Sequence, residues 1–223
     1  MVKLAPSLAC CDFLHIGDTI KDFEANGIDL IHFDISDTSF CSTIMLPMGL
    51  VPQLKKYTKL PLDIHMMVAH PEDLIDTIKA PLDENDFISV QVEGTTELSN
   101  CLLQAKQVCK AGAVLNMATP ISELEYVAEL LDMVILIQGN GGAGMRHNFP
   151  EIMARKTRDL REMLHRYGND HCLISIDGNV TFESIPVFKQ AGADVLVLGT
   201  RTLFNKDGSF ADNVRKTREV LGQ

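Results

Sequence analysis

Histidine and aspartate residues alternate with apolar residues in three short segments of the sequence. In LIHFDIS, residues 30–36, the polar residues His32, Asp34 and Ser36 occupy every second position. Because successive side chains of a β-strand point to opposite faces, the polar residues share one face and the apolar residues share the other. The segments PLDIHMMV (61–68) and CLISIDG (172–178) repeat the pattern with Asp63, His65, Met67, Ser175 and Asp177. If the apolar faces pack against helices, the polar faces point into the protein interior.

Two imidazoles and two carboxylates in one interior would need compensation. A single inward histidine is usually a hydrogen-bonded core residue, but burying four such groups without a counter-charge costs several kcal/mol per ion. That is a large part of the roughly 5–15 kcal/mol net stability of a domain. A divalent cation bound by His32, Asp34, His65 and Asp177 would compensate directly. Mixed imidazole and carboxylate ligands suit Zn²⁺, and Fe²⁺, Mn²⁺ or Co²⁺ are alternatives.

A second candidate site is rich in glycine. The segment QGNGGAGMR, residues 138–146, has four glycines and ends with Arg146. Glycines let backbone N–H groups approach an anion closely, although a plain turn or a mobile lid would have the same composition. Gly178 follows one strand-like segment, and Gly199 follows another. These loops together favour a phosphate site.

Eight strand-like segments are available to position these residues, and each is followed by a helical pattern. They lie at 4–9, 30–36, 61–68, 87–93, 112–117, 133–139, 172–178 and 195–200. Eight such alternations without a long linker predict a single (β/α)8 TIM barrel over residues 1–223, with its active site at the carboxyl ends of the strands. Gly27 and Gly192 are expected to end helices in the left-handed conformation, and Gly112 is a weaker third case.

Composition excludes several classes of partner. The 223 residues are 46% hydrophobic and 22% charged, which is enough for a full core without disulfides. A net charge of -10 argues against nucleic acid and against an anionic membrane surface. The six cysteines form no CxxC pair, and no apolar run approaches a membrane span. We expect a cytoplasmic protein with reduced thiols.

Longer motifs carry a resemblance to a known family. The runs LAPSLACCDFLHIGD, LIHFDISD, PLDIHMMVAHPE, LNMATPISELEYV and IDGNVTFESIPVFKQAGADVLVLGT resemble the ribulose-phosphate 3-epimerase family over essentially the whole chain. The resemblance implies a metal site at the four residues named above and a homo-oligomer that binds a small sugar phosphate. It also implies a substrate site. The substrate-binding residues expected here are Ser7, Met67, Gly142, Gly144, Met145, Arg146, Gly178, Asn179, Gly199 and Thr200.

This chain departs from the family pattern around the substrate. Ser36 replaces the usual methionine after the second strand, Gln91 replaces the usual histidine of the fourth strand, and GGAGMR replaces PGFGGQ. These changes leave the four ligands intact but alter the walls of the site and the phosphate loop. Asp37 is interpreted as a solvated loop carboxylate, with a positioning role for a metal ligand as the alternative.

The resemblance implies inversion at C3 of a ketose phosphate, with Asp34 and Asp177 as the catalytic acid/base pair acting through a cis-enediolate. The substrate would be of the ribulose 5-phosphate and xylulose 5-phosphate type. Three alternatives remain open at this stage. One is a hexulose-phosphate epimerase, such as one acting on allulose 6-phosphate. Another is a decarboxylase or synthase, which would need an inward lysine. The third is a barrel that binds sugar phosphate without catalysis.

Overall fold

The eight expected strands form one parallel sheet in a computed structural model of the chain, which describes residues 1–142 and 148–223. The strands are β1 (Lys3–Pro6), β2 (Ile31–Ser36), β3 (Leu62–Met67), β4 (Phe87–Gln91), β5 (Lys110–Leu115), β6 (Met133–Ile137), β7 (Leu173–Asp177) and β8 (Val195–Leu198). The hydrogen-bonded order is β1-β8-β7-β6-β5-β4-β3-β2, and a bridge between Ser7 and His32 brings the two ends of the sheet together. The predicted (β/α)8 barrel is therefore confirmed.

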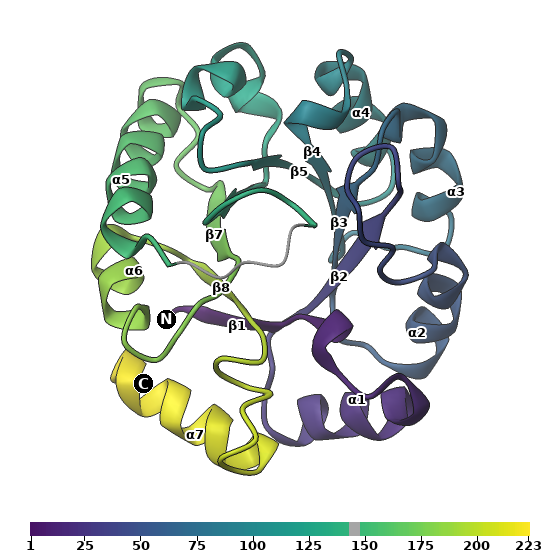
Figure 1. Cartoon of the computed structure of the whole chain (residues 1–223). Coiled ribbons are helices and arrows are strands. Elements are labelled where there is room, and N and C mark those ends of the chain that lie inside the picture. The colour runs from purple at the N-terminus through teal and green to yellow at the C-terminus, as the bar shows by residue number, and fades with distance from the viewer. Residues whose placement is uncertain (143–147) are drawn as a thin grey trace.

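Helices surround the barrel, as Figure 1 shows in a view along its axis. They are α1 (Ile16–Ala25), α2 (Val51–Tyr57), α3 (Ile75–Lys79), α4 (Leu98–Ala105), α5 (Pro150–Arg166), α6 (Ile185–Ala191) and α7 (Phe210–Leu221). The position after β5 is taken by a ten-residue 3-10 helix, η6 (Ile121–Leu130). Within the described residues, no helix has both the length and the apolar character that crossing a membrane requires.

Apolar side chains form two separate clusters because the strands are covered on both faces. The larger cluster lies between the strands and the surrounding helices, where Phe33, Ile64 and Phe188 are fully buried. The smaller cluster includes Leu30 and Phe87. These two residues share the face of the polar residues two positions further along β2 and β4. The barrel interior is thus apolar toward the amino ends of these strands and polar toward the carboxyl ends.

Glycines confirm two of the three expected helix ends. Gly27 and Gly192 have φ angles of +64° and +94° after α1 and α6, in the left-handed region that glycine tolerates best. The expectation for Gly112 was wrong, because this residue lies inside β5 beside Ser89. A Cβ atom at Gly112 would lie only 2.6 Å from the Ser89 hydroxyl. Glycine is needed there for the close packing of β4 and β5, not for a turn.

Candidate active site

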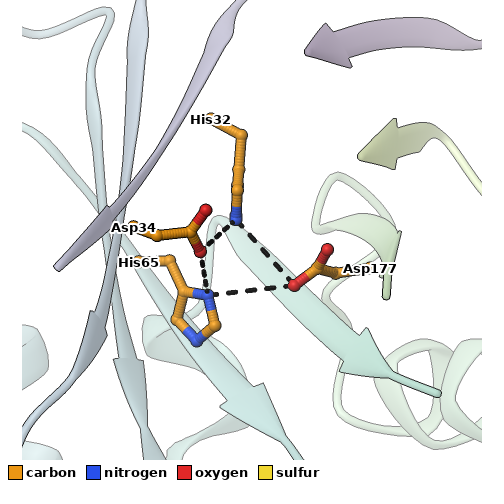
Figure 2. A group of neighbouring side chains, drawn as sticks. All are labelled: His32, Asp34, His65 and Asp177. Carbon is orange, nitrogen blue, oxygen red and sulfur yellow. Dashed lines mark hydrogen bonds and ion pairs between the residues drawn. The ribbon is translucent and has the colours of Figure 1, made fainter. Parts of the chain in front are cut away.

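The four predicted metal ligands converge inside the barrel, as Figure 2 shows. Asp34 Oδ1 lies 3.1 Å from His32 Nε2 and 3.2 Å from His65 Nδ1. Asp177 Oδ2 lies 3.9 Å from each of the same two nitrogens. One ligand atom from each residue lies within 4.8 Å of the others, so the group could hold a metal ion. Strands β2, β3 and β7 supply these ligands because their inward faces carry them at matching depth.

In each histidine, the ring nitrogen that points away from the cluster is already hydrogen-bonded to another side chain. His32 Nδ1 lies 2.7 Å from Asp63 Oδ2, and His65 Nε2 lies 2.9 Å from Gln91 Oε1. Each ring therefore presents one remaining nitrogen to the cluster. Two imidazole nitrogens and two carboxylate oxygens are a donor set that fits Zn²⁺ and related divalent cations.

The two aspartates of the cluster are held in different ways. Ser7 Oγ donates to Asp34 Oδ2 at 2.8 Å, while Asp34 Oδ1 faces both histidines. Asp177 Oδ1 accepts the Gly178 backbone N–H at 2.6 Å. Asp34 thus receives its bonds from side chains of three strands or their ends, and Asp177 depends on its own loop.

These surroundings shift the pKa values of the two aspartates in opposite directions. Burial disfavours the ionised form of Asp34, but the charge and hydrogen bonds of His32, with those of His65, outweigh it and hold the Asp34 pKa well below its usual range. Burial raises the pKa of Asp177, and the nearby Asp34 charge raises it further against the opposing effect of the histidines. Two carboxylates with different proton affinities are the arrangement that acid/base pairs use.

The deeper part of the polar interior supports the ligands. Ser89 Oγ donates to Asp63 Oδ1 at 3.0 Å, so Asp63 is bonded at both oxygens. Asp63, Ser89 and His32 are fully buried. The hydroxyl of Ser175, two residues before Asp177, is also buried but has no hydrogen-bond partner among the described residues.

A cavity of about 350 Å³ opens beside the cluster. Both aspartates line it, and the two histidines lie behind them. The predicted substrate-binding residues in its lining are Ser7, Met67, Gly142, Gly178, Asn179, Gly199 and Thr200. Gly144, Met145 and Arg146 lie outside the described residues. The structure therefore brings seven of the ten expected residues to one cavity.

The lining also includes residues that the sequence reasoning missed. They are Ala9, Cys10, Thr43, Met45, Ile137, Asn140, Gly141, Val180, Val197 and Arg201. Ile137 and Val197 continue the inward alternation of β6 and β8, and Asn140 lies inside the glycine-rich segment, so these three could have been included. Thr43 and Met45 come from an irregular loop where neither the two-residue nor the helical period applies.

The loop after β2 is folded by two residues at its start. Ser36 Oγ donates to the Thr43 carbonyl at 2.7 Å and accepts the Met45 N–H at 2.8 Å. Asp37 Oδ1 accepts two loop N–H groups, and its Oδ2 accepts the Ala69 N–H at 3.0 Å. The interpretation of Asp37 as a solvated carboxylate was therefore wrong, because its oxygens cap backbone groups of two loops. Ser36 and Asp37 together hold Thr43 and Met45 against the cavity.

Backbone conformation shapes the other side of the cavity. Gly178 has a φ angle of +87° and Asn179 of +51°, so the chain turns sharply directly after Asp177. At Gly142, with a φ angle of +69°, a Cβ atom would lie 2.3 Å from Cys41 Sγ. Glycine at this position lets the loop after β6 pack against the loop after β2 beside the cavity. A turn over residues 200–204 follows Gly199.

Comparison with known proteins finds relatives over most of the chain. Residues 3–204 match the pattern of the ribulose-phosphate 3 epimerase family. The chain is 35% identical over 209 residues to a ribulose-phosphate 3-epimerase of Bacillus subtilis, covering 93% of this chain and 94% of that protein. It is 36% identical over 210 residues to a chloroplastic ribulose-5-phosphate-3-epimerase of Arabidopsis thaliana, covering 92% of this chain and 73% of that protein.

Solved structures share the fold at low sequence identity. KGPDC from Streptococcus mutans has a TM-score of 0.71 at 11% identity, covering 100% of this chain and 98% of that chain. A 3-hexulose-6-phosphate synthase has a TM-score of 0.63 at 13% identity, covering 98% and 99%. These likenesses show the barrel fold alone. The family match and the curated relatives go further: the chain belongs to the ribulose-phosphate 3-epimerase family and is an isomerase of the epimerase type.

Proposed function

We propose that this enzyme inverts C3 of a ketose phosphate, with Asp34 and Asp177 as its acid/base pair. One observation carries the proposal. The two carboxylates come from β2 and β7, which are separated by β1 and β8 around the barrel, yet their oxygens lie within 4.8 Å of each other beside a cavity. A sugar lying between them would present one face of C3 to each.

Two carboxylates are needed because inversion requires a proton to leave one face and another to arrive on the opposite face. One aspartate removes the proton from C3, and the electron pair left behind is shared with the C2 carbonyl as a cis-enediolate. The other aspartate then gives a proton to the far side of C3. In the reverse direction the two residues exchange roles.

A divalent cation at the four ligands would supply electrostatic stabilisation of the negative charge that develops on the sugar oxygens. A carboxylate alone is a weak base for a proton beside a carbonyl, so the site must lower the barrier by several kcal/mol, and each 1.36 kcal/mol is tenfold in rate. Ser7 and the two histidines orient Asp34, and the Gly178 N–H orients Asp177. Zn²⁺ is the proposed cation, with Fe²⁺, Mn²⁺ and Co²⁺ as alternatives.

The proposed substrate is ribulose 5-phosphate or xylulose 5-phosphate. The names of the curated relatives support the pentulose, and the turns that follow Gly178 and Gly199 would offer backbone N–H groups to the phosphate. A hexulose phosphate, such as allulose 6-phosphate, is the second candidate. In the loop after β2, Ser36 bonds to the backbone of Thr43 and Met45. This loop favours the hexulose phosphate, because the residues of this cavity wall depart from the family pattern.

Two rival functions have less support. A decarboxylase or synthase would need an inward lysine, but the described residues lining the cavity include no lysine. Lys3 and Lys110, the lysines that begin β1 and β5, lie at the amino ends of those strands. A barrel that only binds sugar phosphate would not need four converging ligands and two differently held aspartates.

We also propose a cytoplasmic homo-oligomer. All six cysteines are free thiols, as expected in a reducing compartment. Phe13 and Leu14 are adjacent in a short 3-10 helix and are 53% and 89% exposed, and neighbouring apolar side chains of this kind suit contact with another copy of the chain. Gel filtration with light scattering would give the subunit number.

The experiment that tests the function is NMR of ketose phosphates in heavy water with the Zn²⁺-loaded enzyme. We expect deuterium to enter C3 as the epimer forms, with ribulose 5-phosphate reacting faster than allulose 6-phosphate. If allulose 6-phosphate reacts faster, the hexulose phosphate becomes the preferred substrate and the pentulose phosphate the second candidate. No deuterium at C3 with either sugar would overturn the proposed epimerisation.

A further inference from the structure

The two histidines of the cluster have chemically different partners behind them. His32 is bonded to Asp63, whose carboxylate can only accept a hydrogen bond. His65 is bonded to Gln91, whose amide could present either its oxygen or its NH₂ group. Because Asp63 can only accept, His32 must carry a proton on Nδ1, the nitrogen that faces Asp63. Gln91 requires a proton on the facing nitrogen of His65 only if its amide is held in one orientation.

Glu93 supplies that constraint. Gln91 Nε2 donates to Glu93 Oε2 at 2.6 Å, and Gln91 is fully buried. Because a carboxylate has no hydrogen to donate, Gln91 must turn its NH₂ group toward Glu93. Its oxygen is then left for the Nε2–H group of His65. The opposite orientation would set oxygen against oxygen at Glu93.

We propose that Glu93 is a positioning residue for the metal site and acts through the direction of the Gln91 amide. By holding that amide, Glu93 keeps the His65 Nε2–H group bonded to the Gln91 oxygen, so that Nδ1 is the nitrogen left for a cation beside Asp34 and Asp177. The inference rests on the proposed function, since it assumes that the cluster binds a cation. Partners of this kind typically change metal affinity by 10–100-fold when removed.

Glu93 is held in place by a second set of bonds that offers a control. Its Oε1 accepts the Asn116 N–H at 3.0 Å and the hydroxyl of Thr119. Thr119→Val removes one bond to the same carboxylate but leaves its bond to Gln91. If Glu93 mattered only for local stability, Thr119→Val and Glu93→Gln would have similar consequences for the cation.

The test is calorimetric titration of the metal-free full chain with Zn²⁺. Glu93→Gln gives the side chain an NH₂ group that can face Gln91, so the Gln91 amide can reverse and direct its own NH₂ group at His65. Because Glu93 is exposed, we expect the lower end of the range, a loss of about tenfold in Zn²⁺ affinity. Thr119→Val should retain the wild-type affinity, whatever its melting temperature. Equal affinities of wild type and Glu93→Gln would overturn the inference.

A reversed pair provides the rescue. In the double variant Gln91→Glu with Glu93→Gln, the carboxylate at position 91 can only accept hydrogen bonds. It accepts one from His65 Nε2–H and one from the amide NH₂ group at position 93. We expect this variant to recover Zn²⁺ affinity to within about threefold of wild type. A folded double variant that binds Zn²⁺ as weakly as Glu93→Gln would contradict the proposed direction of the bonds.

NMR of the Zn²⁺-loaded chain gives a readout that does not depend on the rescue. With ¹⁵N-labelled histidine, the Nε2–H proton of His65 should give the signal of a hydrogen-bonded group in the wild type, because the Gln91 oxygen accepts it, and should exchange faster with water in Glu93→Gln. An unchanged Nε2–H signal would overturn the inference even if the double variant did not fold. Failure of the wild-type protein to bind Zn²⁺ would instead count against the proposed metal site.

Discussion

The two sides of the barrel mouth hold their polar groups by different means. On the side of β2, β3 and β4, side chains bond to side chains: Asp34 contacts Ser7 and both histidines, and each histidine has a further partner behind it. On the side of β6, β7 and β8, backbone geometry dominates. Asp177 is bonded to its own loop, and positive φ angles at Gly142 and Gly178 shape the cavity wall.

From this difference we infer that one side of the barrel mouth binds the cation and the other binds the phosphate. Side-chain networks fix the positions and proton affinities of charged groups, as a metal site requires. Backbone N–H groups in tight turns are suited to an anion such as phosphate. Substitutions on the first side should therefore alter the chemistry or the cation, whereas substitutions on the second side should alter substrate binding, with Asp177 as the exception.

The largest loss of activity should come from replacing Asp34 or Asp177, the acid/base group that each side contributes. In Asp34→Asn and Asp177→Asn, one face of C3 loses its acid/base group, and we expect kcat to fall by at least about 10³-fold. Epimerisation of ribulose 5-phosphate with a coupled enzyme assay would measure this. Full activity of Asp177→Asn would contradict the assigned role, because no other described residue offers a carboxylate to that side of the cavity.

A smaller effect should follow from removing support on the β2 side. Asp63→Asn weakens the acceptor for His32 Nδ1, and we expect Zn²⁺ affinity to fall by about 10–100-fold. Asp86→Asn is the matched control, since Asp86 is also fully buried but bonds to Lys55 and backbone groups away from the cluster. Calorimetry should show lower affinity only in Asp63→Asn. An equal loss in both variants would point to general destabilisation.

The β2 side should also respond to pH. Burial favours the neutral form of His32, but the Asp34 and Asp63 carboxylates outweigh it and raise the His32 pKa well above its ordinary value. In the metal-free chain this stabilisation is fully present below the unfolded pKa of about 6.5 and is lost as pH rises through the folded pKa.

A cation reverses this trend because it binds only the deprotonated ring. We expect Zn²⁺ affinity to rise by up to about tenfold per pH unit for each proton released, until the ring is neutral. Melting temperatures with Zn²⁺ and with a chelator, measured from pH 6 to 9, should move further apart as pH rises. A constant difference would show that no proton leaves the site on metal binding.

The smallest effect should come from the backbone on the β7 side. Gly178→Ala places a side chain at a φ angle of +87°, which costs about 1–2 kcal/mol and disturbs the turn after Asp177. We expect a several-fold rise in KM with a smaller change in kcat. Gly168→Ala is the matched control, because Gly168 has a φ angle of +72° with nothing within 4 Å of an added Cβ. Urea unfolding should show similar losses, whereas KM should change only in Gly178→Ala.

The comparison also separates what the sequence could predict from what it could not. Alternation along eight strands predicted the barrel, and it placed His32, Asp34, His65 and Asp177 on inward faces where the structure brings them together. This worked because side-chain direction in a strand has a fixed period of two residues. Glycines after β7 and β8 similarly indicated the turns that line the cavity.

Loop residues had no such period. Thr43 and Met45 reach the cavity only because Ser36 and Asp37 fold the loop between them, and hydrogen bonds of this kind leave no spacing rule in the sequence. Gly112 was misplaced for a related reason. Glycine serves both helix ends and close strand packing, and only the three-dimensional neighbour, Ser89, distinguishes the two uses.

Anomalous diffraction from crystals of the Zn²⁺-loaded enzyme tests the central claim most directly. The account predicts one strong peak bonded to His32 Nε2, Asp34, His65 Nδ1 and Asp177, at distances of about 2.0–2.2 Å. A peak at any other position, or none at the mouth of the barrel at saturating Zn²⁺, would contradict it.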